Sequence, residues 1–195
     1  DTQMGALSAD QFASLTGNQV GGLTSTQIAN LTTTQVAAMT AAQINALNFT
    51  QLGAFTPDEM DALSVTQIGA LASVAVRGLN STALSALSPA QFAGLTSAQV
   101  GGFSTQQIQS LDAGQIAALN STQVKGLQPA QISAFSASQL NALAATQWAA
   151  MLSSQILGLT GAQIGALTET SLAALGPAQL AGLSNTALAG LTEEI

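Results

Sequence analysis

The 195-residue sequence contains no cysteine, no histidine and no tyrosine, and its only cations are Arg77 and Lys125. Without cysteine, no disulfide can staple the fold. Without histidine or cysteine, and with few acidic residues scattered along the chain, there is no nucleophile–base pair and no ligand set for a transition metal. We therefore expect neither an enzyme nor a protein that binds a cofactor or a metal.

Charge and long apolar runs are also scarce. Charged residues make up 6% of the chain, and the formal net charge is −7. Two cations cannot neutralise a row of phosphates, which argues against a nucleic-acid partner. Stretches without a polar residue, such as 149–152, are far shorter than the ~20 apolar residues of a membrane-spanning helix. We expect no membrane span.

What the sequence does contain is a single octad, repeated with a period of eight and without an insertion or deletion. The octad that begins at Thr32 reads T-T-T-Q-V-A-A-M. It consists of a hydroxyl residue, two variable residues, a Gln, a large apolar residue, two small residues and a Met that is usually Leu elsewhere. Counted from Ser8, 24 first positions follow one another to Thr192. We expect residues 1–195 to form a single solenoid domain of about 24 octads.

The first and fourth positions of the octad have the spacing of a helix capping box. The first position is Ser, Thr, Asn or Asp in 19 of 24 octads, and the fourth is Gln in 19 of 24. In such a box the hydroxyl accepts from the backbone N–H three residues later, and the Gln side chain reaches back to the N–H of the cap. All four prolines occupy the second position, the first helical residue, where a missing N–H costs nothing. Each octad should therefore open a new helix; the pairs that we assign are Thr16 and Gln19, Thr24 and Gln27, Thr32 and Gln35, Thr40 and Gln43, Thr96 and Gln99, and Thr160 and Gln163.

The fifth and eighth positions predict the core. The fifth is apolar in all 24 octads, and the eighth is Leu, Met or Phe in all 24. Two apolar residues three apart form one face of a short helix. The seventh position is nearly always Ala or Gly, which lets a neighbouring backbone approach closely. The core residues that we assign on this basis are Val20, Leu23, Ile28, Leu31, Val36, Met39, Ile44, Leu47, Ile164 and Leu167.

These patterns favour an all-α solenoid of short capped helices. One long helix is excluded, because an octad turns by ~800° and equivalent residues would drift by ~80° at each repeat. A β-solenoid is the alternative, since Thr, Val and Ile suit strands, although Ala-Ala and Gly-Ala pairs interrupt the alternation that strands need. Eight residues bury too little apolar surface to offset their conformational entropy, so stability must come from stacking on neighbours.

Three groups of residues depart from the pattern. Octads 72–79 and 80–87 lack the Gln, which indicates drift in a redundant array, a bend or a contact site. Acidic residues crowd the octad 56–63, where a Ca²⁺ site is the alternative to acids that suit the start of a helix; they are Asp58, Glu59 and Asp61. The richest apolar cluster is either a variation of the core or a lateral interface; it consists of Trp148, Met151, Leu152 and Leu157.

The two ends show no polar cap of the kind that usually closes an array of stacked repeats. Asp1 lies within an octad, and residues 192–195 begin another one. We expect further repeats, or stacked copies of the chain, to continue both ends.

Three runs carry a resemblance to known proteins: 31–39, 93–101 and 166–170. With their A-L-[ST]-x-x-Q-[IV]-x pattern they resemble tandem arrays in large secreted or surface proteins of bacteria, labelled adhesin-, haemagglutinin- or haem-utilisation-like. The resemblance extends over the whole chain and implies an extracellular or cell-surface stalk or filament. We expect a structural protein whose partner is itself, stacked end to end. Ice binding, suggested by regularly spaced Thr residues, and peptide or glycan binding are the alternatives.

Overall fold

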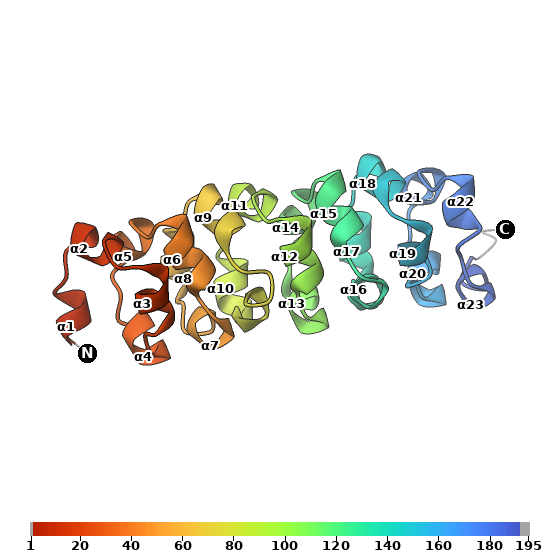
Figure 1. The fold of residues 1–195 in the computed structure, drawn as a ribbon. Helices are drawn as coiled ribbons and strands as arrows, with labels where there is room; N and C mark the ends of the chain where they lie inside the picture. Colours follow the sequence, from red (N-terminus) through yellow and green to blue (C-terminus); the bar gives the residue numbers. More distant parts are fainter. Residues whose placement is uncertain (1, 192–195) are drawn as a thin grey trace. The chain divides into compact units, whose positions relative to one another are not determined.

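The structure is a computed structural model that describes residues 2–191. Short α-helices and one 3₁₀ helix, η1, follow one another in chain order, and there is no strand between residues 2 and 191 (Figure 1). The prediction of an all-α solenoid of short helices is confirmed, and the β-solenoid alternative is wrong. The chain divides into two compact units, unit 1 (Asp1–Gly102) and unit 2 (Phe103–Ile195). That the whole chain forms one solenoid domain stays a prediction.

Unit 1 contains one short helix for each octad of its described residues. Its elements are α1 (Thr2–Gly5), α2 (Ala9–Ala13), α3 (Gly17–Gly21), α4 (Ser25–Ile28), α5 (Thr33–Ala37), α6 (Ala41–Ala46), α7 (Phe49–Leu52), α8 (Pro57–Asp61), α9 (Val65–Ala70), η1 (Val76–Gly78), α10 (Ser81–Ser85), α11 (Pro89–Ala93) and α12 (Ser97–Gly102).

Unit 2 repeats the same arrangement. Its elements are α13 (Thr105–Ser110), α14 (Ala113–Ala117), α15 (Ser121–Gly126), α16 (Pro129–Ala134), α17 (Ala137–Asn141), α18 (Ala145–Ala150), α19 (Ser153–Ile156), α20 (Gly161–Gly165), α21 (Glu169–Ala173), α22 (Pro177–Leu180) and α23 (Asn185–Leu188).

Each octad folds into about one helical turn followed by a sharp corner. After α6, the backbone N–H of Leu47 donates to the carbonyl oxygen of Ile44 over 3.2 Å, which tightens the end of the helix. Leu47 and Asn48 are then extended, with ψ angles of 131° and 175°. Two extended residues in succession redirect the chain into the next helix. No residue in the described part of the chain has a positive φ, glycines included, so the glycines do not serve to make these corners.

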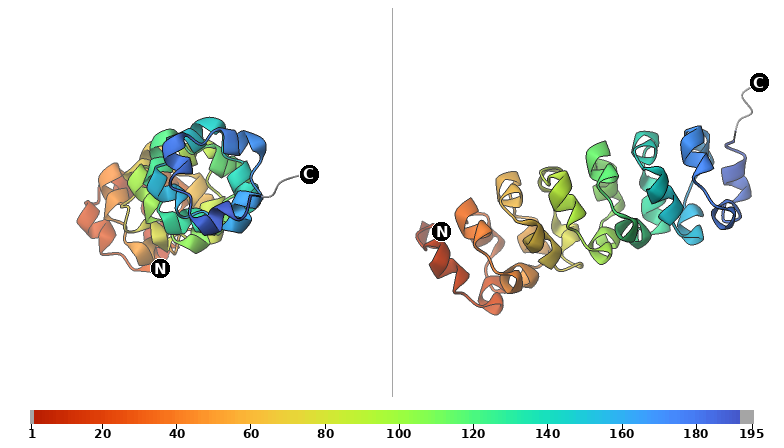
Figure 2. Two further views of the ribbon diagram at one scale, coloured as in Figure 1. Left: turned by 90° about the vertical axis from the view of Figure 1, so that its right-hand side faces the viewer. Right: turned by 90° about the horizontal axis from the view of Figure 1, so that it is seen from above.

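Successive helices wind into a coil in each unit. Within each unit, helices pack against the third helix along the chain, as α3 does against α6 in unit 1 and α13 against α16 in unit 2. Hydrogen bonds between neighbouring turns join residues 25 to 31 apart in the sequence. One turn of the coil therefore takes more than three octads and fewer than four. The end-on view in Figure 2 shows the helices of unit 2, green to blue, arranged in a ring.

The core fills the inside of each coil with side chains from the fifth and eighth positions. Trp148, Phe92 and Ile44 at fifth positions are fully buried, and Leu47 at an eighth position is 1% exposed. Leu23 is half-buried, because it lies in the first turn of unit 1 and has a neighbouring turn on one side only. The other residues assigned to the core are buried; they are Val20, Ile28, Leu31, Val36, Met39, Ile44, Leu47, Ile164 and Leu167.

Candidate functional site: the junction between turns

Most of the helices whose octads carry both residues of the motif begin with a capping box of the predicted geometry. In α5 the Thr32 Oγ1 accepts from the backbone N–H of Gln35 over 3.2 Å, and the Thr32 N–H donates to the Gln35 Oε1 over 2.8 Å. The other assigned pairs form the same two hydrogen bonds; they are Thr16 and Gln19, Thr24 and Gln27, Thr40 and Gln43, Thr96 and Gln99, and Thr160 and Gln163.

The Gln half of the box persists where the cap has no suitable side chain. The backbone N–H groups of Ala144, Leu152 and Gly176 donate to the Oε1 of the Gln three residues later, over 2.6 to 2.8 Å. In these octads the backbone N–H of the Gln donates to the carbonyl oxygen of the cap residue, over 2.9 Å in each case. The Gln therefore keeps its half of the box without a cap side chain.

The amide nitrogen of the same Gln joins one turn of the coil to the previous one. The Gln43 Nε2 donates to the carbonyl oxygens of Phe12 and Leu15, over 2.9 and 2.8 Å. These acceptors lie 31 and 28 residues earlier, at a fifth and an eighth position. We call the residues that make such bonds the glutamine ladder; they are Gln35, Gln43, Gln51, Gln67, Gln91 and Gln99 in unit 1, and Gln131, Gln139, Gln147, Gln155, Gln163 and Gln179 in unit 2.

The ladder explains why the fourth position is Gln. A capping box accepts Gln or Glu, but only an amide combines an acceptor oxygen with two N–H donors. The ladder side chains are at most 7% exposed, and a buried carbonyl group without a donor costs about 1–3 kcal/mol. The capping box by itself does not predict the bonds that the Gln amide nitrogen makes to the previous turn. The signal was present in the sequence, as the near-absence of Glu from a position where a cap alone would tolerate it.

Small residues at the seventh position bring the backbones of neighbouring turns together. A Cβ atom added to Gly78 would collide with the carbonyl oxygen of Phe49, and one added to Gly158 would collide with that of Pro129. In both pairs the partner lies 29 residues earlier, at a second position. The glycines are therefore needed for close approach between turns.

The octad 72–79 is the most irregular part of unit 1. Ala75 occupies the Gln position and is 2% exposed, and the octad forms only η1, without a side-chain cap. Arg77 supplies a different bond to the next turn, since its Nε donates to the carbonyl oxygen of Gly102 over 2.7 Å. The missing Gln is thus accompanied by a changed helix type and by another side-chain bond between turns.

The apolar cluster in unit 2 does not form one surface. Trp148 and Met151 are 0% and 4% exposed, because they occupy a fifth and an eighth position and point into the core. The expectation of a lateral interface is therefore wrong for these two residues. Leu152 and Leu157 are 49% and 59% exposed, so these two members of the cluster lie on the surface. The Trp148 indole N–H is buried and has no hydrogen-bond partner in the described residues.

The first turn of unit 1 contains Gln side chains whose amide nitrogens lack the acceptors that the ladder residues have. Gln11, Gln19 and Gln27 accept from the N–H of their caps, but among the described residues their Nε2 groups have no acceptor. Leu15 and Leu23 at eighth positions are half-buried in the same turn. This end therefore presents amide donors beside partly exposed leucines.

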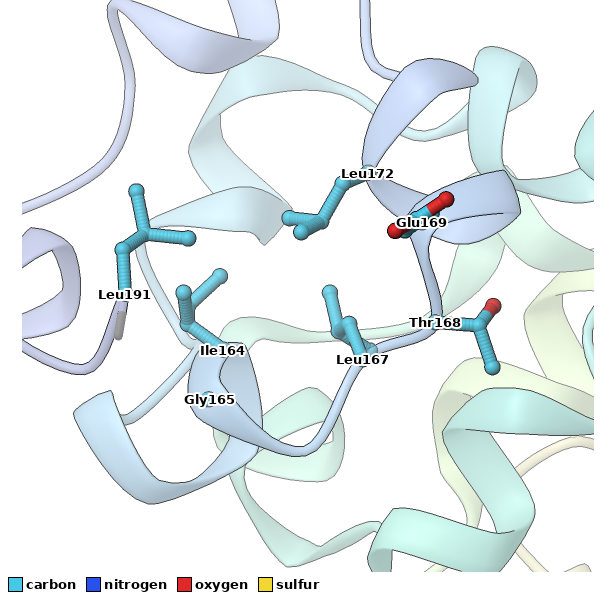
Figure 3. Close-up of a pocket in the computed structure, with 7 residues that line it drawn as sticks. All are labelled: Ile164, Gly165, Leu167, Thr168, Glu169, Leu172 and Leu191. Atoms are coloured by element: carbon cyan, nitrogen blue, oxygen red, sulfur yellow. The ribbon is translucent and has the colours of Figure 1, made fainter. Parts of the chain in front are cut away.

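The last turn of unit 2 has exposed apolar side chains. Leu180, Leu188 and Leu191 are 42–46% exposed. A cavity of about 540 Å³ opens beside them and is lined by Ile164, Gly165, Leu167, Thr168, Glu169, Leu172 and Leu191. Figure 3 shows the apolar side chains turned toward its centre, with Thr168 and Glu169 on one side. The large apolar lining residues occupy fifth and eighth positions, so the cavity is lined by side chains of the core type.

The fold and the repeated junction define the class of this protein as a helical tandem-repeat protein. No helix within residues 2–191 has the length and apolar character required to cross a bilayer. The profile of the family described as the ALTTAQ repeat matches residues 1–33, 18–48 and 68–105. These overlapping matches support a tandem-repeat protein. No curated protein matches the chain.

Proposed function

We propose that this repeat protein is structural, and that it builds an extracellular filament or an adhesin stalk by stacking end to end on further copies of itself. The observations that carry the proposal are junction groups in the first turn of unit 1 and apolar groups in the last turn of unit 2. Amide donors and half-buried leucines lie on the first turn of unit 1, and exposed leucines and a cavity lined partly by core-type side chains lie at the last turn of unit 2. A second copy could therefore continue the junction that already joins the turns.

The extracellular part of the proposal rests on the resemblance of the octads to arrays in secreted bacterial surface proteins. Labelling of intact source cells with an antibody against the chain tests it, and signal only after the cells are permeabilised would contradict it. Ice binding has less support, because the cap hydroxyls of residues such as Thr32 and Thr40 already accept a backbone hydrogen bond.

Sedimentation velocity and electron microscopy across a range of protein concentration test the assembly. We expect end-to-end rods that lengthen with concentration. The triple variant Gln11→Glu, Gln19→Glu and Gln27→Glu should stay monomeric, because carboxylates have no donor for the carbonyl oxygens of the adjoining turn.

A charge-matched control separates this effect from simple repulsion. Gln106, Gln109 and Gln128 are exposed, and replacing all three by Glu adds the same charge away from the end turns. This control should assemble like the unchanged chain. Monomers at every concentration for the unchanged chain would overturn the self-assembly part of the proposal.

A further inference from the structure

Glu59 replaces Gln at the fourth position of the octad 56–63. Its side chain is 3% exposed, and its Oε2 accepts from the backbone N–H of Thr56 over 2.7 Å and from the Thr56 hydroxyl over 2.9 Å. Glu59 thus keeps the acceptor half of the role that Gln has elsewhere. The Ca²⁺ reading of this acidic octad is weakened, because its middle carboxylate is turned inward and engaged with its own cap.

The donor half of that role needs a proton on the carboxyl group. On either side of Glu59, the Gln51 Nε2 donates to the carbonyl oxygens 31 and 28 residues earlier, and the Gln67 Nε2 does the same. The residues 31 and 28 positions before Glu59 are Ile28 and Leu31, which are 0% and 7% exposed, and their carbonyl oxygens are the equivalent acceptors. A carboxylate offers these oxygens no hydrogen, whereas a carboxylic acid offers one.

The surroundings of Glu59 provide no cation. Its helix α8 packs against α5 and α10, and neither of these helices contains a titratable residue. The charged neighbours on α8 itself are Asp58 and Asp61, which are also acidic. Arg77, the cation of unit 1, donates its Nε to Gly102. Every charge on the elements around Glu59 therefore opposes a second negative charge there.

We propose that Glu59 in its protonated form donates its carboxyl proton to the backbone of the previous turn, so that this junction is tightened by acid and loosened by ionisation. The rest of the glutamine ladder does not titrate. Glu59 thus makes this junction responsive to pH.

The direction of the effect follows from the burial. Desolvation raises the pKa of the Glu59 carboxyl and outweighs the two hydrogen bonds from Thr56, which lower it, and the charge of Asp58 raises it further. The pKa is therefore higher in the folded chain than in the unfolded chain. The stabilisation from this group is complete below the unfolded pKa and is lost as the pH rises through the folded pKa.

Carbon-13 NMR of the full chain labelled at glutamate carboxyls tests the proposal directly. The Glu59 signal is assigned as the one that disappears in Glu59→Gln. We expect it to titrate at a higher pH than the signals of the other three glutamates. A midpoint equal to or below theirs would overturn the proposal.

Thermal unfolding across the same pH range provides a second readout. Glu59→Gln restores the ladder residue, so its midpoint temperature should exceed that of the unchanged chain at neutral pH, and the difference should shrink toward acid pH. Glu169→Gln is the matched control, because Glu169 is exposed in the first turn of α21, and it should show no such pH-dependent gain. A gain for Glu59→Gln that is the same at every pH would show that ionisation of Glu59 has no part in it.

Discussion

At the scale of single residues, a Gln of the glutamine ladder uses both polar atoms of its side chain. In Gln147 the Oε1 accepts from the N–H of Ala144 over 2.6 Å, and the Nε2 donates to the carbonyl oxygens of Ile116 and Leu119 over 3.0 and 2.6 Å. One side chain therefore starts its own helix and satisfies the backbone of the previous turn. Removal of this side chain should leave buried polar groups on both sides of the junction without a hydrogen-bond partner.

The substitution Gln147→Ala tests this role. It should lower the free energy of unfolding by about 1–3 kcal/mol, because the buried carbonyl group of Leu119 loses its donor and that of Ile116 keeps only the backbone N–H of Leu119. Ala75 and Ala83 occupy equivalent positions in unit 1, so the variant should still fold. Gln109→Ala removes the same atoms from an exposed sixth position and should change stability by less than about 0.5 kcal/mol. Urea denaturation measures both; equal effects would contradict the account.

At the scale of the helices, each element is too short to be stable alone. The α-helices contain four to six residues and η1 contains three, whereas isolated helices below about 12–15 residues are marginal in water. The caps set where each helix begins, but contacts with the adjacent turns must hold it. Those contacts depend on how closely two backbones approach, and hence on the seventh position.

The substitution Gly158→Ala tests the close approach. The added methyl group would collide with the carbonyl oxygen of Pro129, so we expect destabilisation of about 1–3 kcal/mol from overpacking. Gly114→Ala is the control, because the nearest atom to its Cβ is the flexible Asp112 Oδ1 at 3.2 Å. There the higher helix propensity of Ala should leave stability unchanged or raise it. A loss at Gly114 as large as at Gly158 would contradict the packing argument.

At the scale of the whole molecule, periodicity predicted the helices, their caps and their core positions, because all three depend on residues within one octad. The number of octads in a turn and the second role of Gln147 depend on contacts between residues 25 to 31 apart, and a capping pattern contains no information about them. Local apolar composition left Trp148 open between the core and a lateral interface. Its fifth position in the octad decided for the core.

The central claim is that the stack, and not the octad, is the unit of stability. In both units the same junction recurs from turn to turn, with ladder bonds to the eighth-position carbonyl oxygens of 2.6 to 2.9 Å. A segment that contains hardly more than one turn has few such bonds, and each added turn supplies more. Stability should therefore rise with the number of turns, as in other solenoids.

Circular dichroism of segments of increasing length tests this claim most directly. Residues 8–39 span four octads and residues 8–71 span eight, and the full chain is the reference. We predict that the four-octad segment is largely unfolded, and that helicity per residue and the unfolding temperature both increase with length. A four-octad segment as helical per residue as the full chain would contradict the account.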